Sequence, residues 1–367
     1  MSEEQSMPWW RRLYMGAKAE IGALARVNVS DRLWQMPVAA ALASGLPLLV
    51  GAWFDHLDYG LVSSLAGLVF LYMPPTPLSH RMVFLMACAF AMTACYTLGV
   101  ISHFVPILMM PTLIFIAVLA AMLCRFYGVG MPGSLFFIMV ASIGAYSPIG
   151  ILEVPLMVGL FSMGTLLAGL IGFFYSLHAL SLRPAQPVPE RPPVNFESMV
   201  LEPVVFGTFV GLSLAAAQVL QLEKAYWVPV SCLAVIQGTS LRAVWTKKVH
   251  RILGTSVGLM VAWGLLSLPL DKWTIALVMM ALSFIIETAV VRHYAVAVVF
   301  ITPLTILLAE AATLGHGPTA ELVQARFFDT VLGCTIGLAG GFCLHDPRLR
   351  GPLRAVLLRL TPQRLRG

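Results

Sequence analysis

The chain has 367 residues, of which 59% are hydrophobic and 11% charged, and its formal net charge is +6. A soluble domain has about 25% charged residues, so this chain has too few to cover a water-exposed surface. The composition therefore excludes an ordinary soluble protein and indicates that lipid is the main solvent. Apolar blocks of roughly 20 residues, the length of a helix that crosses the hydrocarbon core, alternate with short polar breaks. A membrane barrel would show shorter segments of alternating polarity instead, so the pattern predicts helices.

The apolar blocks predict an all-α polytopic membrane protein of about twelve transmembrane helices. The first six are expected at 34–53, 59–74, 81–102, 105–123, 132–148 and 153–178. The second six are expected at 203–220, 226–239, 249–268, 272–290, 294–312 and 324–344. The chain thus divides into an interfacial segment (1–33), a first six-helix unit (34–178), a linker (179–202), a second unit (203–344) and a basic tail (345–367). The linker is rich in proline, which cannot continue a helix.

The distribution of basic residues predicts the orientation. With the N-terminus in the cytoplasm, all but Lys224, Lys272 and Arg326 of the 23 Lys and Arg residues lie on the cytoplasmic side, as the positive-inside rule requires. Both termini are then cytoplasmic. The first 33 residues contain no apolar run typical of a cleavable signal peptide. The segments 8–12 and 348–366 are basic and amphipathic, which favours a position on an anionic lipid surface.

Similar residues recur in the two units at a nearly constant offset along the chain. The matching pairs are Tyr59 with Tyr226, His80-Arg81 with His250-Arg251, Arg125-Phe126-Tyr127 with Arg292-His293-Tyr294, and Gly169-x-x-Gly172 with Gly337-x-x-Gly340. Because each unit has an even number of helices, both enter the membrane with the same polarity. The pattern predicts two parallel repeats related by a pseudo-two-fold axis along the membrane normal.

Two arginines at equivalent positions are the first candidates for a binding site. Arg125 and Arg292 each lie in a short break and precede Tyr127 and Tyr294, respectively, by two residues. A guanidinium pair facing a central path would attract a carboxylate. The alternative is that both arginines and both tyrosines only anchor the cytoplasmic interface.

Two acidic residues lie inside apolar segments. Glu287 and Asp329 are candidates for proton coupling, because an intramembrane carboxylate is costly unless it has a function. Alternatively, Glu287 pairs with a nearby arginine and Asp329 stays solvated at the outer interface. Their counterparts in the first unit are apolar, namely Ala120 and Phe161, so any coupling would be asymmetric.

Short or interrupted helices at matching places point to a transport path. The second helix of each unit is short and begins at an aromatic residue, Tyr59 in one and Tyr226-Trp227 in the other. The fifth helices are interrupted by glycines and prolines between 128 and 133 and by Pro303. Pro303 could equally be an ordinary kink. These three aromatic residues and Pro303 complete the predicted substrate path.

No enzymatic or cofactor signature is present. The sequence lacks a P-loop, a nucleophile elbow and a zinc-protease motif, so we expect no enzyme and no cofactor. The 6 cysteines form no C-x-x-C pair, so we expect no metal site. The basic segments have apolar faces, which favours lipid over nucleic acid.

The second unit resembles a known family. The stretches Tyr226-Trp227-Val-Pro-Val, Arg251-x-x-Gly254-Thr255-x-x-Gly258, Arg292-His-Tyr294 and Arg326-x-x-Asp329-Thr330-x-x-Gly333 resemble the fusaric acid resistance (FUSC) family. That family includes the aromatic acid exporters and is distantly related to the plant aluminium-activated malate channels. The first unit matches it loosely. Larger family members have a cytosolic domain between the units, where this chain has only the linker.

The resemblance implies a multi-pass protein of the bacterial inner membrane that exports small organic acids, aromatic acids above all. We expect proton-coupled transport of such an acid, alone or together with a periplasmic membrane-fusion protein and an outer-membrane factor. Two alternatives remain open at this point. One is an uncoupled organic-anion channel, and the other is a non-transporting membrane partner of an envelope complex.

Overall fold

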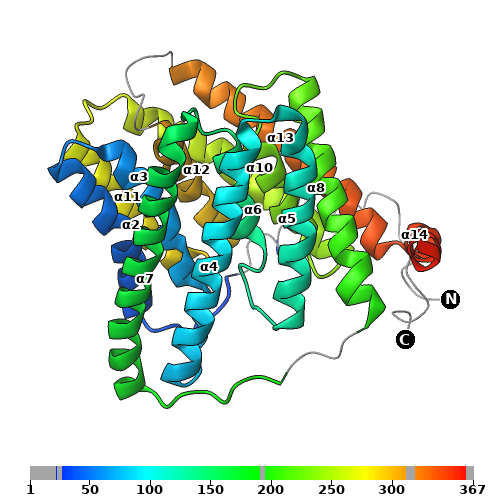
Figure 1. Ribbon diagram of the computed structural model, residues 1–367, viewed down its shortest axis with the longest axis horizontal. Helices are drawn as coiled ribbons and strands as arrows, with labels where there is room; N and C mark the ends of the chain where they lie inside the picture. The colour runs from blue at the N-terminus through cyan, green and yellow to red at the C-terminus, as the bar shows by residue number, and fades with distance from the viewer. Residues whose placement is uncertain (1–21, 23–26, 191–194, 311–318, 361–367) are drawn as a thin grey trace.

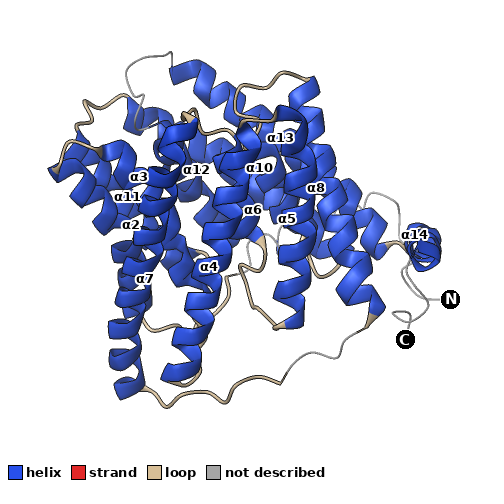
Figure 2. Ribbon diagram, in the orientation of Figure 1, coloured by secondary structure: helices blue, strands red, loops and turns tan. Residues whose placement is uncertain are grey.

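The structure is a computed structural model that describes residue 22 and residues 27–190, 195–310 and 319–360. Every regular element in these ranges is a helix (Figure 2). The prediction of an all-helical protein is therefore confirmed. The predicted interfacial segment at 8–12 lies outside the described residues.

Each of the twelve predicted ranges contains a helix. The first unit comprises α2 (Gln35–Trp53), α3 (Leu57–Gly67) with a 3-10 turn (Leu68–Tyr72), α4 (Leu78–His103), α5 (Pro106–Phe126), α6 (Leu135–Ala145) and α7 (Val154–Leu182). After a π-helical turn (Glu197–Leu201), the second comprises α8 (Glu202–Val219), α9 (Trp227–Ile236), α10 (Leu241–Leu266), α11 (Lys272–Ala289), α12 (Tyr294–Glu310) and α13 (Thr319–His345). One further helix, α14 (Pro347–Leu360), follows.

Eight of the described helices are long and apolar enough to cross a membrane. They are Gln35–Trp53, Leu78–His103, Pro106–Phe126, Ile151–Leu182, Glu197–Val219, Leu241–Leu266, Lys272–Ala289 and Val323–His345. Four apolar helices are shorter, namely Leu57–Tyr72, Leu135–Ala145, Trp227–Ile236 and Tyr294–Leu308. The short ones are the second and fifth helices of the two units. The chain is thus an integral helical membrane protein.

Local sequence explains where several helices begin and end. The loop before α6 contains Gly128 and Gly133 with φ angles of 63° and 61°, a conformation that glycine adopts without strain. For this reason α6 starts at Leu135, three residues later than predicted. At the other end of this unit, α7 continues past the predicted end and stops at Leu182, just before Arg183-Pro184.

The helices of the two units pack in corresponding ways. In the first unit α4 packs on α6 and α7, and α3 packs on α7; in the second, α10 packs on α12 and α13, and α9 packs on α13. The units meet where α2 packs on α11 and where α5 packs on α8. The first helix of each unit therefore contacts the fourth helix of the other.

Glycines permit the closest of these approaches. A Cβ added at Gly164 of α7 would lie 2.3 Å from the carbonyl oxygen of Ser63 on α3. A Cβ added at Gly333 of α13 would lie 2.4 Å from the carbonyl oxygen of Val228 on α9. Small residues at such contacts allow two backbones to come together in a membrane, where helix association depends on close packing.

The segment 183–190, which follows α7, runs along the lower end of the bundle (Figure 1). Its Gln186 N–H donates to the carbonyl oxygen of Pro75, with a distance of 2.9 Å. At the end of α2, Lys272 Nζ donates to Asp55 Oδ1 at 2.6 Å, which joins the two units. This hydrogen bond and the charge of Lys272 lower the pKa of the Asp55 carboxyl.

Candidate functional site

Three charged side chains are buried together in the second unit. Arg251 on α10 and Arg326 and Asp329 on α13 are 6%, 5% and 0% exposed. Helices α9 and α12 pack against α13 and α10, respectively, and enclose these residues with aromatic and hydroxyl side chains. We call this group the buried polar column, consisting of Tyr226, Trp227, Ser231, Arg251, Tyr294, Thr305, Arg326 and Asp329.

Arg326 lies against an aromatic face. Its guanidinium carbon is 3.8 Å from the centre of the Trp227 ring, within the range of a cation–π interaction. Its Nη2 donates to Thr305 Oγ1 on α12, with a distance of 3.2 Å. Nε and Nη1 are buried and have no hydrogen-bond partner among the described residues. The guanidinium is therefore held in place, and its Nε and Nη1 donors are available to a ligand.

Asp329 lies one turn further along the same face of α13. Both carboxylate oxygens are buried, and neither has a hydrogen-bond partner in the part of the chain that the structure describes. The next residue, Thr330, donates to the carbonyl oxygen of Arg326 at 2.9 Å rather than to this carboxylate. The alternative of a solvated Asp329 is wrong, since the residue is fully buried.

Arg251 extends the column along the bundle. Its Nη1 donates to the Tyr294 hydroxyl at 3.3 Å and its Nη2 to Ser231 Oγ at 3.5 Å. Thr305, the partner of Arg326, lies three turns beyond Tyr294 on α12, which is about 16 Å along the helix axis. The two arginines therefore contact α12 at positions that lie far apart along it.

This arrangement suits the binding of an anion. A buried polar group without a partner costs about 1–3 kcal/mol, and a buried charge costs more unless something compensates it. A carboxylate would accept from the free N–H groups of Arg326 and match the planar guanidinium. Such a costly cluster in a membrane protein is a functional-site candidate.

The first unit, whose residues 34–178 the structure describes in full, contains no such column. Its Arg81, the counterpart of Arg251, donates from Nε to the Thr76 carbonyl oxygen, 2.5 Å away, at the start of its own helix. Phe161, the counterpart of Asp329, is fully buried and stacks on Tyr96 with ring centres 4.5 Å apart. Aromatic packing thus fills the place that the second unit gives to a carboxylate.

The predicted arginine pair lies elsewhere. Arg125 forms an ion pair with Glu202 on α8 at 2.5 Å, and its guanidinium carbon is 5.3 Å from the Phe206 ring centre. Arg292 is exposed between α11 and α12, and its carbonyl oxygen accepts from the Asn28 N–H. Tyr127 is 54% exposed. Arg125 therefore joins α5 to α8, and the buried polar column does not include either arginine.

The other predicted residues divide between the column and separate contacts. Glu287 forms an ion pair with Arg32 at 3.0 Å. Pairing with an arginine is the alternative to proton coupling for this residue. Tyr59 stacks on His56 near the end of α2, with ring centres 4.7 Å apart. Pro303 is buried within α12. Of the predicted residues, Tyr226, Trp227 and Asp329 lie near Arg326, and Tyr294 contacts Arg251.

Arg251 and Arg326 belong to the column but are not among the site residues predicted from the sequence. Arg326 is near the outer end of the predicted helix 324–344, whereas it lies about two turns inside α13. The signal that could have found it is its spacing, since an arginine and an aspartate one turn apart share a helix face.

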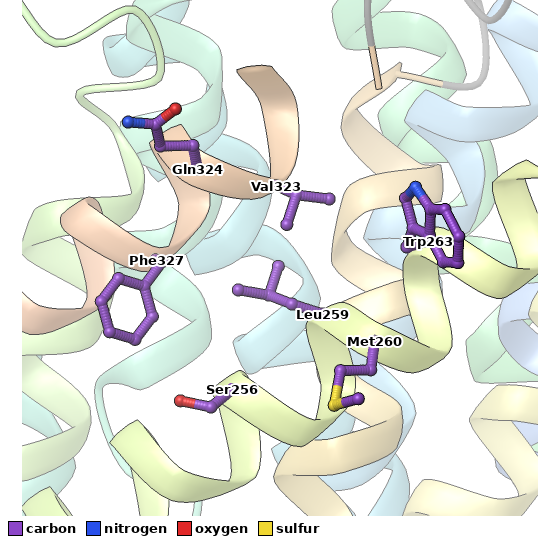
Figure 3. Close-up of a pocket in the computed structure, with 7 residues that line it drawn as sticks. All are labelled: Ser256, Leu259, Met260, Trp263, Val323, Gln324 and Phe327. Atoms are coloured by element: carbon purple, nitrogen blue, oxygen red, sulfur yellow. The ribbon is translucent and has the colours of Figure 1, made fainter. Parts of the chain in front are cut away.

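An open groove lies beside the column, between α10 and α13 (Figure 3). Its volume is about 510 Å³, and it is lined by Ser256, Leu259, Met260, Trp263, Val323, Gln324 and Phe327. Leu259 belongs to a buried cluster with Ile306, the neighbour of Thr305. Among the described residues, no group of three or more His, Cys, Asp or Glu could hold a metal ion.

The bundle of apolar helices and its buried charges define a polytopic membrane protein with an intramembrane polar site. Residues 206–340, which contain the whole column, match the model of the family described as fusaric acid resistance protein-like. The resemblance drawn from the sequence is thereby confirmed for the second unit.

The chain is also similar to "Uncharacterized membrane protein YvaC" of Bacillus subtilis (strain 168). The two are 21% identical over an alignment of 466 residues that covers 87% of this chain and 74% of YvaC. Because the alignment is longer than the chain, YvaC has residues without a counterpart here. No solved structure matches the chain.

Proposed function

We propose that the protein is a secondary transporter that exports small organic acids through the buried polar column. The observation that supports this most is the coexistence of unpartnered donors on Arg326 and unpartnered acceptors on Asp329 in one buried site. An anion entering the site would accept hydrogen bonds from the Arg326 donors, and a proton would neutralise the Asp329 carboxylate. The site therefore suits the exchange of a carboxylate for a proton.

Trp227 favours an aromatic acid. Its ring is 2% exposed and lies against Arg326, and the Tyr226 ring packs beside it at 5.1 Å. A flat substrate whose carboxylate contacts Arg326 would meet aromatic surface at the same place. This is the acid class that the family resemblance implies.

We further propose that the four short apolar helices also cross the membrane, which gives two parallel six-helix repeats. The corresponding helix contacts of the two units and the reciprocal contacts of α2 with α11 and α5 with α8 support this arrangement. The distribution of basic residues favours cytoplasmic termini, and the resemblance to the family favours a bacterial inner membrane. A membrane-fusion protein and an outer-membrane factor would complete export across a two-membrane envelope.

Reconstituted proteoliposomes test the proposed function. We expect flux of an aromatic acid such as benzoate to depend on an imposed proton gradient, with acid and proton moving in opposite directions. A linear anion current that is indifferent to the gradient would instead identify an uncoupled channel. No flux of any organic acid from well-folded protein would support a non-transporting partner.

A further inference from the structure

The C-terminal helix α14 is fastened to the bundle by arginine–glutamate pairs. Arg350 pairs with Glu197 on the π-helical turn and lies 3.8 Å from Glu202. Arg354 Nε lies 3.5 Å from Glu197 Oε1. Glu202 is shared with Arg125 on α5. Three arginines thus share two glutamates, and the junction keeps a positive charge.

Apolar contacts fix which flank of α14 faces the protein. Leu353 and Leu357 pack against the buried cluster that includes Leu201 and Leu344. On a helix these positions lie beside those of Arg350 and Arg354, so one flank combines the ion pairs with the apolar contacts.

Two other sides of α14, one beside this flank and one opposite it, are exposed. Leu349 and Val356, two turns apart, are 45% and 55% exposed. Arg348 and Arg359, three turns apart, are also exposed. They lie beside the row of Leu349 and Val356 and opposite the flank that faces the bundle. An apolar row next to a basic row is typical of a helix that lies in the membrane interface.

The position of α14 agrees with that pattern. In Figure 1, α14 is seen nearly end-on at the right, whereas α5 and α8 run up the page. It therefore lies crosswise to long helices that cross the membrane, beside the end of α13. A helix that lies crosswise to transmembrane helices and has adjacent apolar and basic rows is typical of the membrane interface.

We propose that α14 is a binding surface for anionic phospholipids. Arg348 and Arg359, about 16 Å apart along the helix axis, bind the phosphates of separate headgroups, and Leu349 and Val356 enter the upper acyl region. The excess positive charge at the Glu197–Glu202 junction adds to the attraction, since basic residues near a membrane surface favour anionic lipid. This site is separate from the buried polar column, so it stands independently of the transported substrate.

Native mass spectrometry of the delipidated full-length protein tests the site. The probes are phosphatidylglycerol and phosphatidylcholine, titrated in parallel. We expect wild type to retain phosphatidylglycerol several-fold more than phosphatidylcholine. The double variant R348Q/R359Q should lose most of that preference, and R348K/R359K should keep it, since the charge remains.

A matched control removes two arginines elsewhere. The variant R183Q/R242Q lowers the net charge equally but leaves α14 intact, and it should keep the preference. An unchanged preference in R348Q/R359Q, or no preference in wild type, would overturn the proposal. Equal displacement of the lipid by inorganic phosphate would also overturn it, because the site would then be one for a soluble anion.

Discussion

The guanidinium of Arg326 lies 3.8 Å from the centre of the Trp227 ring, which places a permanent charge on α13 against the start of the short helix α9. Both residues are almost fully buried. The contact links α9, one of the four short apolar helices, to α13, which carries Asp329. It therefore defines the centre of the proposed path.

Replacement of Trp227 should weaken this centre in a graded way. A cation–π contact contributes about 0.5–2 kcal/mol, so Trp227→Phe should retain part of the stability and Trp227→Leu less. The expected order of thermal unfolding midpoints in detergent is wild type, Phe variant, Leu variant. Equal midpoints in all three would show that the ring does not stabilise Arg326.

Asp329→Asn should affect transport more than stability. The substitution removes a buried charge whose oxygens have no hydrogen-bond partner among the described residues, but it also removes the anion beside Arg326, so the unfolding midpoint should change little. Organic-acid flux should fall at least tenfold and lose its dependence on the proton gradient. Glu321→Gln, on the exposed start of the same helix, is the control and should behave as wild type. Proton-dependent flux in Asp329→Asn would exclude this carboxylate from coupling.

Gly333→Ala should destabilise the contact between α9 and α13. The new Cβ would lie 2.4 Å from the Val228 carbonyl oxygen, so the helices must separate, at a cost of about 1–3 kcal/mol. Gly264→Ala on α10 is the matched control, because nothing lies within 4 Å of its added Cβ. Alanine there should stabilise the helix by up to about 1 kcal/mol. If the two variants unfold alike, the close approach is not a constraint.

The Arg125–Glu202 pair should contribute to structure rather than to transport. Both side chains are about 30% exposed (31% and 27%), and a double-mutant cycle on such a pair should give about 0.2–1 kcal/mol. Flux in Arg125→Gln should stay near that of wild type. If both Arg125→Gln and Arg292→Gln lose flux but insert normally into the membrane, the substrate binds at Arg125 and Arg292, as predicted from the sequence.

The contact between Asp55 and Lys272 should depend on pH. The lowered pKa of Asp55 means that the contact is complete above about pH 4, the usual value of a free aspartate. It is lost as the pH falls through the lower value of the folded protein. Protease access to the loop around Asp55 should therefore rise in acid, and Asp55→Asn should show that access at every pH. Access that does not change with pH in wild type would contradict this.

The fold could be predicted because lipid imposes strong rules on sequence. Apolar blocks marked the helices, and proline and glycine marked their ends to within a few residues, as at α6 and α7. The aromatic residues at the start of α9 and the acid Asp329 were found for the same reason, since each is unusual within an apolar segment. The parallel repeat and the crossing of the short helices stay predictions.

The binding site was harder to predict because it depends on which residues meet in space. Arg125 and Arg292 looked equivalent in sequence, yet Arg125 has the nearby acid Glu202, which no spacing along the chain reveals. Arg326 was predicted at the outer end of the helix 324–344, but Trp227 and Thr305 from two other helices enclose it. Partners from distant segments decide whether a charge is a surface anchor or a buried ligand.

The most direct test of the account is organic-acid flux through proteoliposomes that contain Arg326→Gln, compared with Arg326→Lys and with wild type at equal amounts of folded protein. We expect Arg326→Gln to retain less than a tenth of wild-type flux, because the donors that would bind the carboxylate have lost their charge. Arg326→Lys should retain more than the Gln variant, since it keeps the charge but not the planar geometry. Wild-type flux in Arg326→Gln would contradict transport through the buried polar column.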